Sequence, residues 1–370
     1  MNIKFSIPNI FNKDLNLVKK IIKSGWLTHG KYTSLFEDEF KKFTNTKYCT
    51  TVSSCTAGLH LSCIASGFKK GDEVIVPSMT HTATAHAVEY TGAKAVFADV
   101  HNFTGNLDLK NIKKNVTKKT KGIILVHMSG IACDLEKIIS FCKKRNIKIL
   151  EDCAHALGTK YRNKHVGNFG LSGSFSFYPT KQLTTGEGGA VITNDINFYN
   201  KIKKLKAFGI DKDIKDRKKQ GDYDVKSLGF NYRMTDFQAS LGYQQIKKYK
   251  KNLLKRKRIA KRYIKNLSKC DQIIFEPYSS NNSYFIFQIF CKKRDFVLKR
   301  FKKLGIGVSV HYLTPLHKMS YYKKKYKINP IKYKNSNLYS KMNISLPVYP
   351  KLKNFEIDFI CKTLINLAIK

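Results

Sequence analysis

Residues 147–195 read IKILEDCAHALGTKYRNKHVGNFGLSGSFSFYPTKQLTTGEGGAVITND, and this stretch decides the fold. Its apolar start, residues 147–150, is too short for a helix and leads directly into two acids. This pattern predicts a buried strand that carries chemistry at its carboxyl end. Further strands are predicted at Phe175 to Tyr178 and at Ala190 to Thr193. A turn between these two strands holds one lysine, Lys181, and several glycines.

Lys181 and Asp152 are the two residues in this stretch whose chemistry suggests a function. A lysine amine is nucleophilic only when it is neutral, and a partly desolvated turn favours that form, so Lys181 suits Schiff-base formation with a carbonyl. A carboxylate such as Asp152 keeps the pyridine nitrogen of pyridoxal phosphate protonated, which allows the ring to accept electrons. On residue types alone, a surface lysine and an ordinary strand-end acid remain an open alternative.

Three segments, in this order and spacing, carry a resemblance to a known enzyme family: EDCAHA at 151–156, SFSFYPTK at 174–181 and TTGEGG at 184–189. They resemble the DegT/DnrJ/EryC1/StrS family of pyridoxal-phosphate-dependent nucleotide-sugar aminotransferases. The resemblance implies that Lys181 is the Schiff-base lysine and Asp152 the pyridine partner. It also implies that His155 lies beside the ring and that Ser176 binds the cofactor phosphate. Some relatives carry histidine in place of the lysine and are dehydrases, so the lysine here favours transamination.

The fold is predicted from an alternation of strands and helices that begins at Tyr48. Strands are expected at 48–52, 73–76, 95–98 and 123–127, and helices at 56–66, 82–90 and 135–145. Such alternation predicts an α/β protein with a largely parallel sheet covered by helices. The resemblance implies fold type I, the aspartate-aminotransferase-like fold. Residues 1–245 would then form an N-terminal segment and a large cofactor-binding domain with a seven-stranded, mostly parallel sheet. Residues 246–370 would form a small α+β domain, with strands at Tyr284 to Phe290 and Val308 to Tyr312.

Two further segments are predicted to bind the cofactor phosphate. SSCTAGL at 53–59 joins a strand to a helix, and free N–H groups at a helix start can hold a phosphate. The match to the family's S-S-x-T-A-x-L segment implies contacts from Thr56 and Ala57. GFNYRM at 229–234 resembles a family segment whose asparagine, here Asn231, reaches the phosphate of the neighbouring subunit. This implies a homodimer with composite active sites.

His81 is predicted to contact the cofactor ring. Many relatives carry Trp, Phe or Tyr at this position, where the aromatic side chain stacks on the ring, and an imidazole can stack as well. A structural histidine is the alternative reading. His86 and Glu89 lie three residues apart on one predicted helix, but no further ligands accompany them, so no metal site is expected.

Composition limits the other classes of function. The 370 residues carry 69 Lys and Arg against 26 Asp and Glu, a formal charge of +43. No nucleic-acid-binding motif accompanies this charge, so nucleic acid is not expected as a partner. An odd count of nine cysteines without C-x-x-C spacing favours free thiols in a reducing cytoplasm. No apolar run approaches membrane-spanning length and no signal peptide is recognised, so a cytoplasmic protein without membrane insertion is expected.

The function expected from the residues and the resemblance is transfer of an amino group from L-glutamate to a nucleotide-linked keto-deoxysugar. The form of residues 184–188, TTGEG, favours amination at C4 over C3. The alternatives are a sugar dehydrase of the same fold, amination of another keto-sugar or a cyclitol, and, from another class, a basic nucleic-acid-binding regulator. Residues 209–226 alternate in charge without an apolar period and predict a mobile surface loop.

Overall fold

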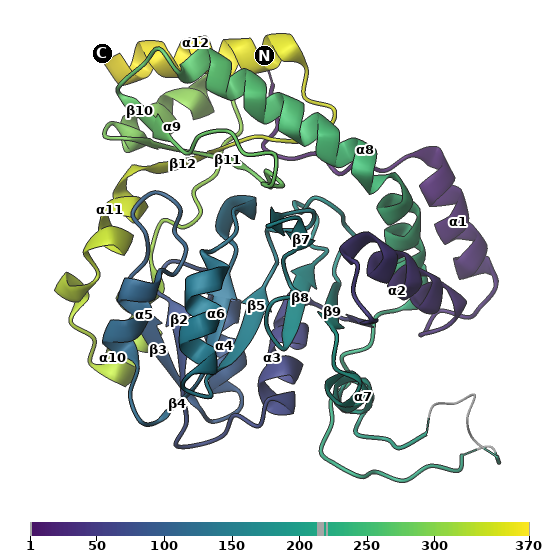
Figure 1. Cartoon of the computed structure of the whole chain (residues 1–370). Helices are drawn as coiled ribbons and strands as arrows, with labels where there is room; N and C mark the ends of the chain where they lie inside the picture. Colours follow the sequence, from purple (N-terminus) through teal and green to yellow (C-terminus); the bar gives the residue numbers. More distant parts are fainter. Residues whose placement is uncertain (1, 213–217, 220, 370) are drawn as a thin grey trace.

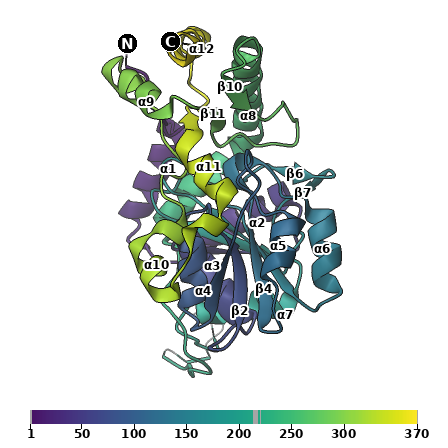
Figure 2. The ribbon, with the colours of Figure 1, turned by 90° about the vertical axis from the view of Figure 1, so that its left-hand side faces the viewer.

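The computed structural model describes residues 2–212, 218–219 and 221–369. A central sheet with helices on both faces makes up the larger part of the molecule, and a smaller layer with its own sheet lies beyond one end of it (Figure 1). Figure 2 shows the same two parts from the side, with helix α8 running along the edge of the smaller part.

The central sheet has seven strands in the order β1-β9-β8-β5-β4-β2-β3. Their bounds are Tyr48–Val52 (β1), Glu73–Pro77 (β2), Lys94–Ala98 (β3), Thr120–Val126 (β4), Lys148–Asp152 (β5), Ser172–Ser176 (β8) and Gly189–Thr193 (β9). Only β9 runs against its neighbours, and the other pairings are parallel. The predicted α/β class and the mostly parallel seven-stranded sheet are thereby confirmed.

Helices cover both faces of this sheet, as expected for parallel strands joined by crossover helices. One face packs against Cys55–Ala65 (α3), Thr82–Glu89 (α4) and Ile196–Leu205 (α7). The other packs against Lys31–Thr44 (α2), Leu109–Asn115 (α5), Leu135–Lys143 (α6) and the first half of Asp236–Leu267 (α8). Neighbouring residues of one strand enter different cores: Ile149 joins the second and Leu150 the first.

The smaller part is built on a three-stranded antiparallel sheet, β10-β11-β12. Its elements are Ile273–Phe275 (β10), Phe287–Cys291 (β11), Arg294–Lys303 (α9), Asn343–Leu346 (β12) and Asn354–Ile369 (α12). The chain start joins it, because Ile3 pairs with Ile306 and lies in the same core. Helix α8 runs unbroken through residue 245, so the domain boundary at that residue stays a prediction.

The remaining elements are short or connect the two parts. They are Asn12–Lys23 (α1), Lys160–Tyr161 (β6), Lys164–His165 (β7), Ser320–Tyr326 (α10), Lys334–Met342 (α11) and 3-10 turns at Met128–Gly130, Leu316–Lys318 and Pro330–Lys332. Helices α10 and α11 come from the C-terminal third of the chain but pack on the large sheet's side of the molecule (Figure 1).

Three local predictions need correction or restriction. The strand expected at 175–178 is β8 and ends at Ser176, because the chain turns at Pro179 to present Lys181. The strand expected at 308–312 is absent; Ser309 makes only an isolated bridge with Ser345 of β12, which takes the edge position beside β11. In the loop predicted at 209–226, residues 213–217 and 220 lie outside the described residues.

Candidate active site

Asp152 is the last residue of β5, at the carboxyl end of the sheet, and is almost completely buried. Its Oδ2 atom accepts a hydrogen bond of 2.8 Å from the Thr84 hydroxyl. Its Oδ1 atom accepts a hydrogen bond of 3.1 Å from the Ala154 backbone N–H and lies 3.9 Å from the Cys55 sulfur. A carboxylate has about four acceptor positions, so these contacts leave capacity for one more donor among the described residues.

Lys181 lies in the turn after β8, where its backbone N–H donates to the Tyr178 carbonyl. Burial lowers the pKa of its amine to about 8, against the opposing effect of the Cys55 and Asp152 charges. The Nζ atom lies 4.5 Å from the ring centre of Phe285. The fold therefore supplies the partly desolvated, partly neutral amine that the sequence predicted.

His155 lies beside this pair. Its ring stacks on Phe285, with 4.4 Å between ring centres, and its Nε2 lies 3.4 Å from the Tyr312 hydroxyl. Burial, followed by the positive charge of Lys181, holds the pKa of His155 well below its usual range. The imidazole is therefore neutral and can act as a hydrogen-bonding group beside a bound ring.

His81 and His311 complete the same cluster of side chains. His81 caps helix α4, with its Nδ1 accepting from the Ala83 N–H, and its ring centre lies 5.9 Å from that of Tyr312. His311 bonds Ser345 at 2.9 Å, and burial lowers its pKa to about 3. Neutral imidazoles and a tyrosine hydroxyl thus surround the space near Lys181.

The predicted phosphate contacts lie at the start of α3. Ser54 caps this helix by accepting from the Ala57 N–H at 3.0 Å, and the first turn of any helix leaves further N–H groups without intrahelical partners. Gly189 lies against this turn, since a Cβ there would be 2.7 Å from the Cys55 nitrogen. Gly189 pairs with Ser176, so Ser176 and the start of α3 both lie next to Gly189. The Ala57 N–H is used by the Ser54 cap, and phosphate contacts from Thr56, Ala57 and Ser176 stay a prediction.

Asn231 is exposed and lies on a segment held against the same corner. The backbone N–H of Ser53 donates to the Tyr232 carbonyl at 2.8 Å, and the Asn231 side chain accepts from Arg233 at 3.2 Å. An exposed amide at this edge is available to a second copy of the chain. Its role toward a neighbouring subunit stays a prediction.

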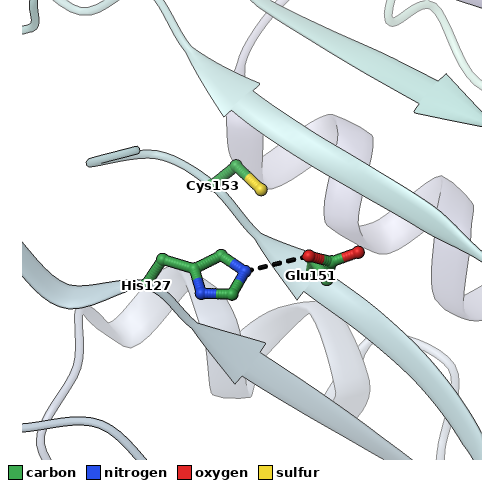
Figure 3. Close-up of side chains that lie close together, drawn as sticks. All are labelled: His127, Glu151 and Cys153. Atoms are coloured by element: carbon green, nitrogen blue, oxygen red, sulfur yellow. Dashed lines mark hydrogen bonds and ion pairs between the residues drawn. The ribbon is translucent and has the colours of Figure 1, made fainter. Parts of the chain in front are cut away.

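A second buried cluster lies one residue away from Asp152 (Figure 3). Glu151 accepts from His127 Nε2 at 2.9 Å and from the N–H groups of Gly167, Phe169 and Gly170 at 2.7 Å each. Burial raises the pKa of Glu151, but these hydrogen bonds outweigh it and the pKa is lowered. Cys153 completes a group of three metal-type ligands. The four acceptor positions of Glu151 are already used, so the geometry favours a structural role.

Sequence reasoning missed several members of the site. Phe285 comes from the smaller part of the chain and carries no motif that marks it, because its proximity to Lys181 arises only from the packing of the two parts. The segment Val310 to Tyr312 resembles a family segment near the substrate cleft, but the sequence assigned no role to either His311 or Tyr312, which lie beside His155. Thr84 could have been found: it lies three residues after His81, inside a predicted helix that follows a predicted strand.

The residues present fit pyridoxal phosphate. A buried carboxylate with acceptor capacity left suits a pyridine N–H, an amine of lowered pKa suits an aldehyde, and a helix start with a glycine packed against it suits a phosphate. In the described part of the chain, no helix is both long and apolar enough to cross a membrane.

Comparison with known proteins identifies the class. The model of the DegT/DnrJ/EryC1/StrS aminotransferase family matches residues 8–365, so the chain belongs to this family. The protein is a sugar aminotransferase, and membership of the family implies dependence on pyridoxal phosphate.

Individual relatives are similar over nearly the whole chain. The GDP-perosamine synthase of Escherichia coli O157:H7 is 35% identical over 362 residues, covering 96% of each chain. The UDP-4-amino-4,6-dideoxy-N-acetyl-beta-L-altrosamine transaminase of Campylobacter jejuni is 34% identical over 379 residues, covering 100% of this chain and 98% of that protein.

Solved structures agree in fold. Helicobacter pylori PseC, an aminotransferase involved in the biosynthesis of pseudoaminic acid, matches with a TM-score of 0.93 at 29% identity over 100% of both chains. The putative sugar aminotransferase Spr1654 of Streptococcus pneumoniae, in its PMP form, matches with a TM-score of 0.93 at 29% identity over 100% of this chain and 99% of that one. These matches confirm the expected fold type.

Proposed function

We propose that this protein transfers an amino group from L-glutamate to a nucleotide-linked 4-keto-deoxysugar. The observation that carries the proposal is the meeting of a buried carboxylate, Asp152, with an amine of lowered pKa, Lys181, at the carboxyl end of a sugar aminotransferase fold. The choice of C4 rests on the form of residues 184–188 and on the Campylobacter relative, a 4-amino-4,6-dideoxy-sugar transaminase by name.

The cofactor, pyridoxal phosphate, supplies an electron sink when it is bound. Asp152 would accept the hydrogen bond of the ring nitrogen and balance its charge, while Thr56, Ala57 and Ser176 would hold the phosphate. His155, neutral and stacked on Phe285, limits the position of the ring on one side.

Lys181 first holds the cofactor and then acts as the proton carrier. With a pKa of about 8, a substantial fraction of its amine is neutral near pH 7 to 8, so it can take a proton from the substrate carbon that bears the amino group and return one. Its Nζ lies against the Phe285 ring, a surface that limits the water around it.

The sugar is expected to bind among the neutral groups of His81, His311 and Tyr312. Neutral imidazoles and a phenol both donate and accept hydrogen bonds, which suits sugar hydroxyls. The excess of positive charge on the chain favours approach of an anionic nucleotide diphosphate.

The test is amino transfer from L-glutamate to a panel of nucleotide-linked 3-keto and 4-keto sugars, with the product mass and the 2-oxoglutarate formed as readouts. A gain of an amino group on 4-keto sugars, lost in Lys181→Ala, supports the proposal. Loss of oxygen without gain of nitrogen indicates a dehydrase, and reaction of 3-keto sugars alone contradicts the C4 assignment.

The homodimer with composite sites has its own test. Lys181→Ala and Asn231→Ala each disable a site, and if Asn231 serves the neighbouring subunit, mixing the two inactive proteins produces heterodimers with one intact site. About a quarter of the wild-type activity is then expected after subunit exchange. No recovery in mixtures that have exchanged subunits contradicts the composite site.

A further inference from the structure

Thr84 is a buried hydroxyl aimed at the carboxylate of the active site. It lies on helix α4, is fully buried, and donates to Asp152 Oδ2 at 2.8 Å across 68 positions of sequence. Threonine inside a helix usually bonds a carbonyl of its own helix or faces solvent. The Thr84 hydroxyl instead contacts Asp152 and Thr80, so both of these hydrogen bonds lie beside the active-site carboxylate.

The order of protons in this contact follows from the chemistry of the groups. An ionised carboxylate can only accept, so the single proton of Thr84 lies toward Asp152. Thr80, also buried, lies 2.9 Å from the Thr84 oxygen and must then donate to it. The result is a chain of two hydrogen bonds: Thr80 donates to Thr84, and Thr84 donates to Asp152. Each bond polarises the other.

We propose that Thr84, supported by Thr80, is a positioning residue that holds the Asp152 carboxylate in the orientation that would meet the ring nitrogen of the cofactor. The inference rests on the proposed role of Asp152. Thr84 holds Oδ2 and the Ala154 N–H holds Oδ1, so rotation of the carboxylate is restricted from both sides. The other groups near the carboxylate are the Cys55 thiol and the Lys181 amine.

The decisive variants are Thr84→Val, which keeps the shape and removes the hydroxyl, and Thr84→Ser, which keeps the hydroxyl. Hydrogen bonds to charged groups are worth enough that their loss corresponds to about a tenfold to hundredfold change. Thr84→Val is therefore expected to weaken cofactor binding to the full-length apoprotein about tenfold. It should also slow the half-reaction with L-glutamate about tenfold with little change in KM, whereas Thr84→Ser stays close to the wild type.

Thr80→Val acts one bond further from the carboxylate and is expected to weaken cofactor binding about twofold to threefold.

Thr44→Val is the matched control, because Thr44 is another fully buried threonine whose hydroxyl is bonded, at 2.8 Å to the Phe40 carbonyl, far from the site in the chain. It should lose stability but keep wild-type cofactor binding. In an Asp152→Asn background, Thr84→Val should weaken cofactor binding less than it does in the wild type.

The inference is overturned if Thr84→Val binds cofactor and reacts with L-glutamate as the wild type does while Asp152→Asn weakens binding. Equal losses of cofactor binding in Thr84→Val and Thr44→Val also overturn it, because the weaker binding would then result from general destabilisation. If the wild-type protein itself fails to bind pyridoxal phosphate, the proposed function fails first, and that result is separate from either of these.

Discussion

Glu151 and Asp152 are neighbours on one strand, yet they build two different kinds of buried site. Glu151 is fully buried and its two oxygens accept four hydrogen bonds, three of them from backbone N–H groups of residues 167–170. Asp152 is also buried, but it accepts only from Thr84 and Ala154 at ordinary distances, with the Cys55 sulfur further away.

The difference follows from the strand and from what each side chain meets. Successive residues of a strand point to opposite faces, so Glu151 reaches the loop at 167–170 while Asp152 reaches the start of α4 and the turn at Lys181. A saturated carboxylate holds a loop in place. A carboxylate with an acceptor position left over can receive a ligand, and the incomplete set of hydrogen bonds marks the functional residue of the two.

The largest expected effect is that of replacing Lys181, the buried amine in the turn after β8. Lys181→Ala should reduce amino transfer by about 10⁴-fold, since both attachment of the cofactor and proton transfer are lost. Steady-state rates and the absorbance of bound cofactor measure this change. The exposed Lys160 on β6 provides a control, with Lys160→Ala close to wild type. Transfer activity that survives in Lys181→Ala would assign the chemistry to another group.

Asp152→Asn is expected to reduce the rate of amino transfer about a thousandfold, because an amide does not balance the charge of a protonated ring. Its free energy of unfolding should fall only modestly, because the amide oxygen can still accept from the Ala154 N–H while the amide NH2 donates to the Thr84 oxygen, once the Thr84 proton turns away. Activity assays and denaturant unfolding on the same preparation measure both quantities. A large loss of stability with unchanged activity would show that Asp152 has the structural role assigned to Glu151.

Glu151→Gln should show the opposite pattern. Losing one partner of a buried, hydrogen-bonded charge costs about 3 kcal/mol of unfolding free energy, because one amide hydrogen then faces the N–H donors of residues 167–170. Protein that remains folded should retain most of its activity. Urea unfolding and active-site titration separate the two effects, and a selective loss of activity would place Glu151 in the chemistry.

The smallest expected effect is on stability, because burial of the Lys181 amine lowers the unfolding free energy of the apoprotein near neutral pH. Its pKa of about 8 lies below the usual 10.5, so between these values the unfolded chain binds a proton that the folded apoprotein does not. Stability of the apoprotein therefore rises with pH from about 8 to about 10.5. Lys181→Met, which cannot be charged, should be more stable than wild type at pH 7 by at most about 3 kcal/mol.

That difference between Lys181→Met and wild type should shrink as the pH approaches 10.5, and denaturant unfolding of both apoproteins at pH 7 and pH 10 measures it. Water that reaches the partly exposed side chain reduces the effect. A stability difference that does not depend on pH would show that the lysine is not destabilised by burial.

The sequence determined the strands of the large sheet, because strand periodicity and turn residues are local signals. The roles of Asp152 and Lys181 came from the resemblance of the motifs around them and stay a prediction. Thr84 lies in a segment with local signals of the same kind, the predicted helix at 82–90 that follows the predicted strand at 73–76. The strand expected at 308–312 did not form: Ser309 bridges Ser345 of β12, but the next inward N–H, that of His311, bonds the Asn343 side chain, so the ladder does not continue.

Tertiary structure alone decided what surrounds the reactive pair. Phe285, His311 and Tyr312 reach Lys181 or His155 from the smaller part, more than 100 positions away in the chain. A resemblance placed residues 310–312 near the substrate cleft, but the contacts that these side chains make depend on how the two parts pack. The same holds for the two acids: their identical burial is predictable from the strand, but the number of donors that each meets depends on loops and helices brought together only by folding.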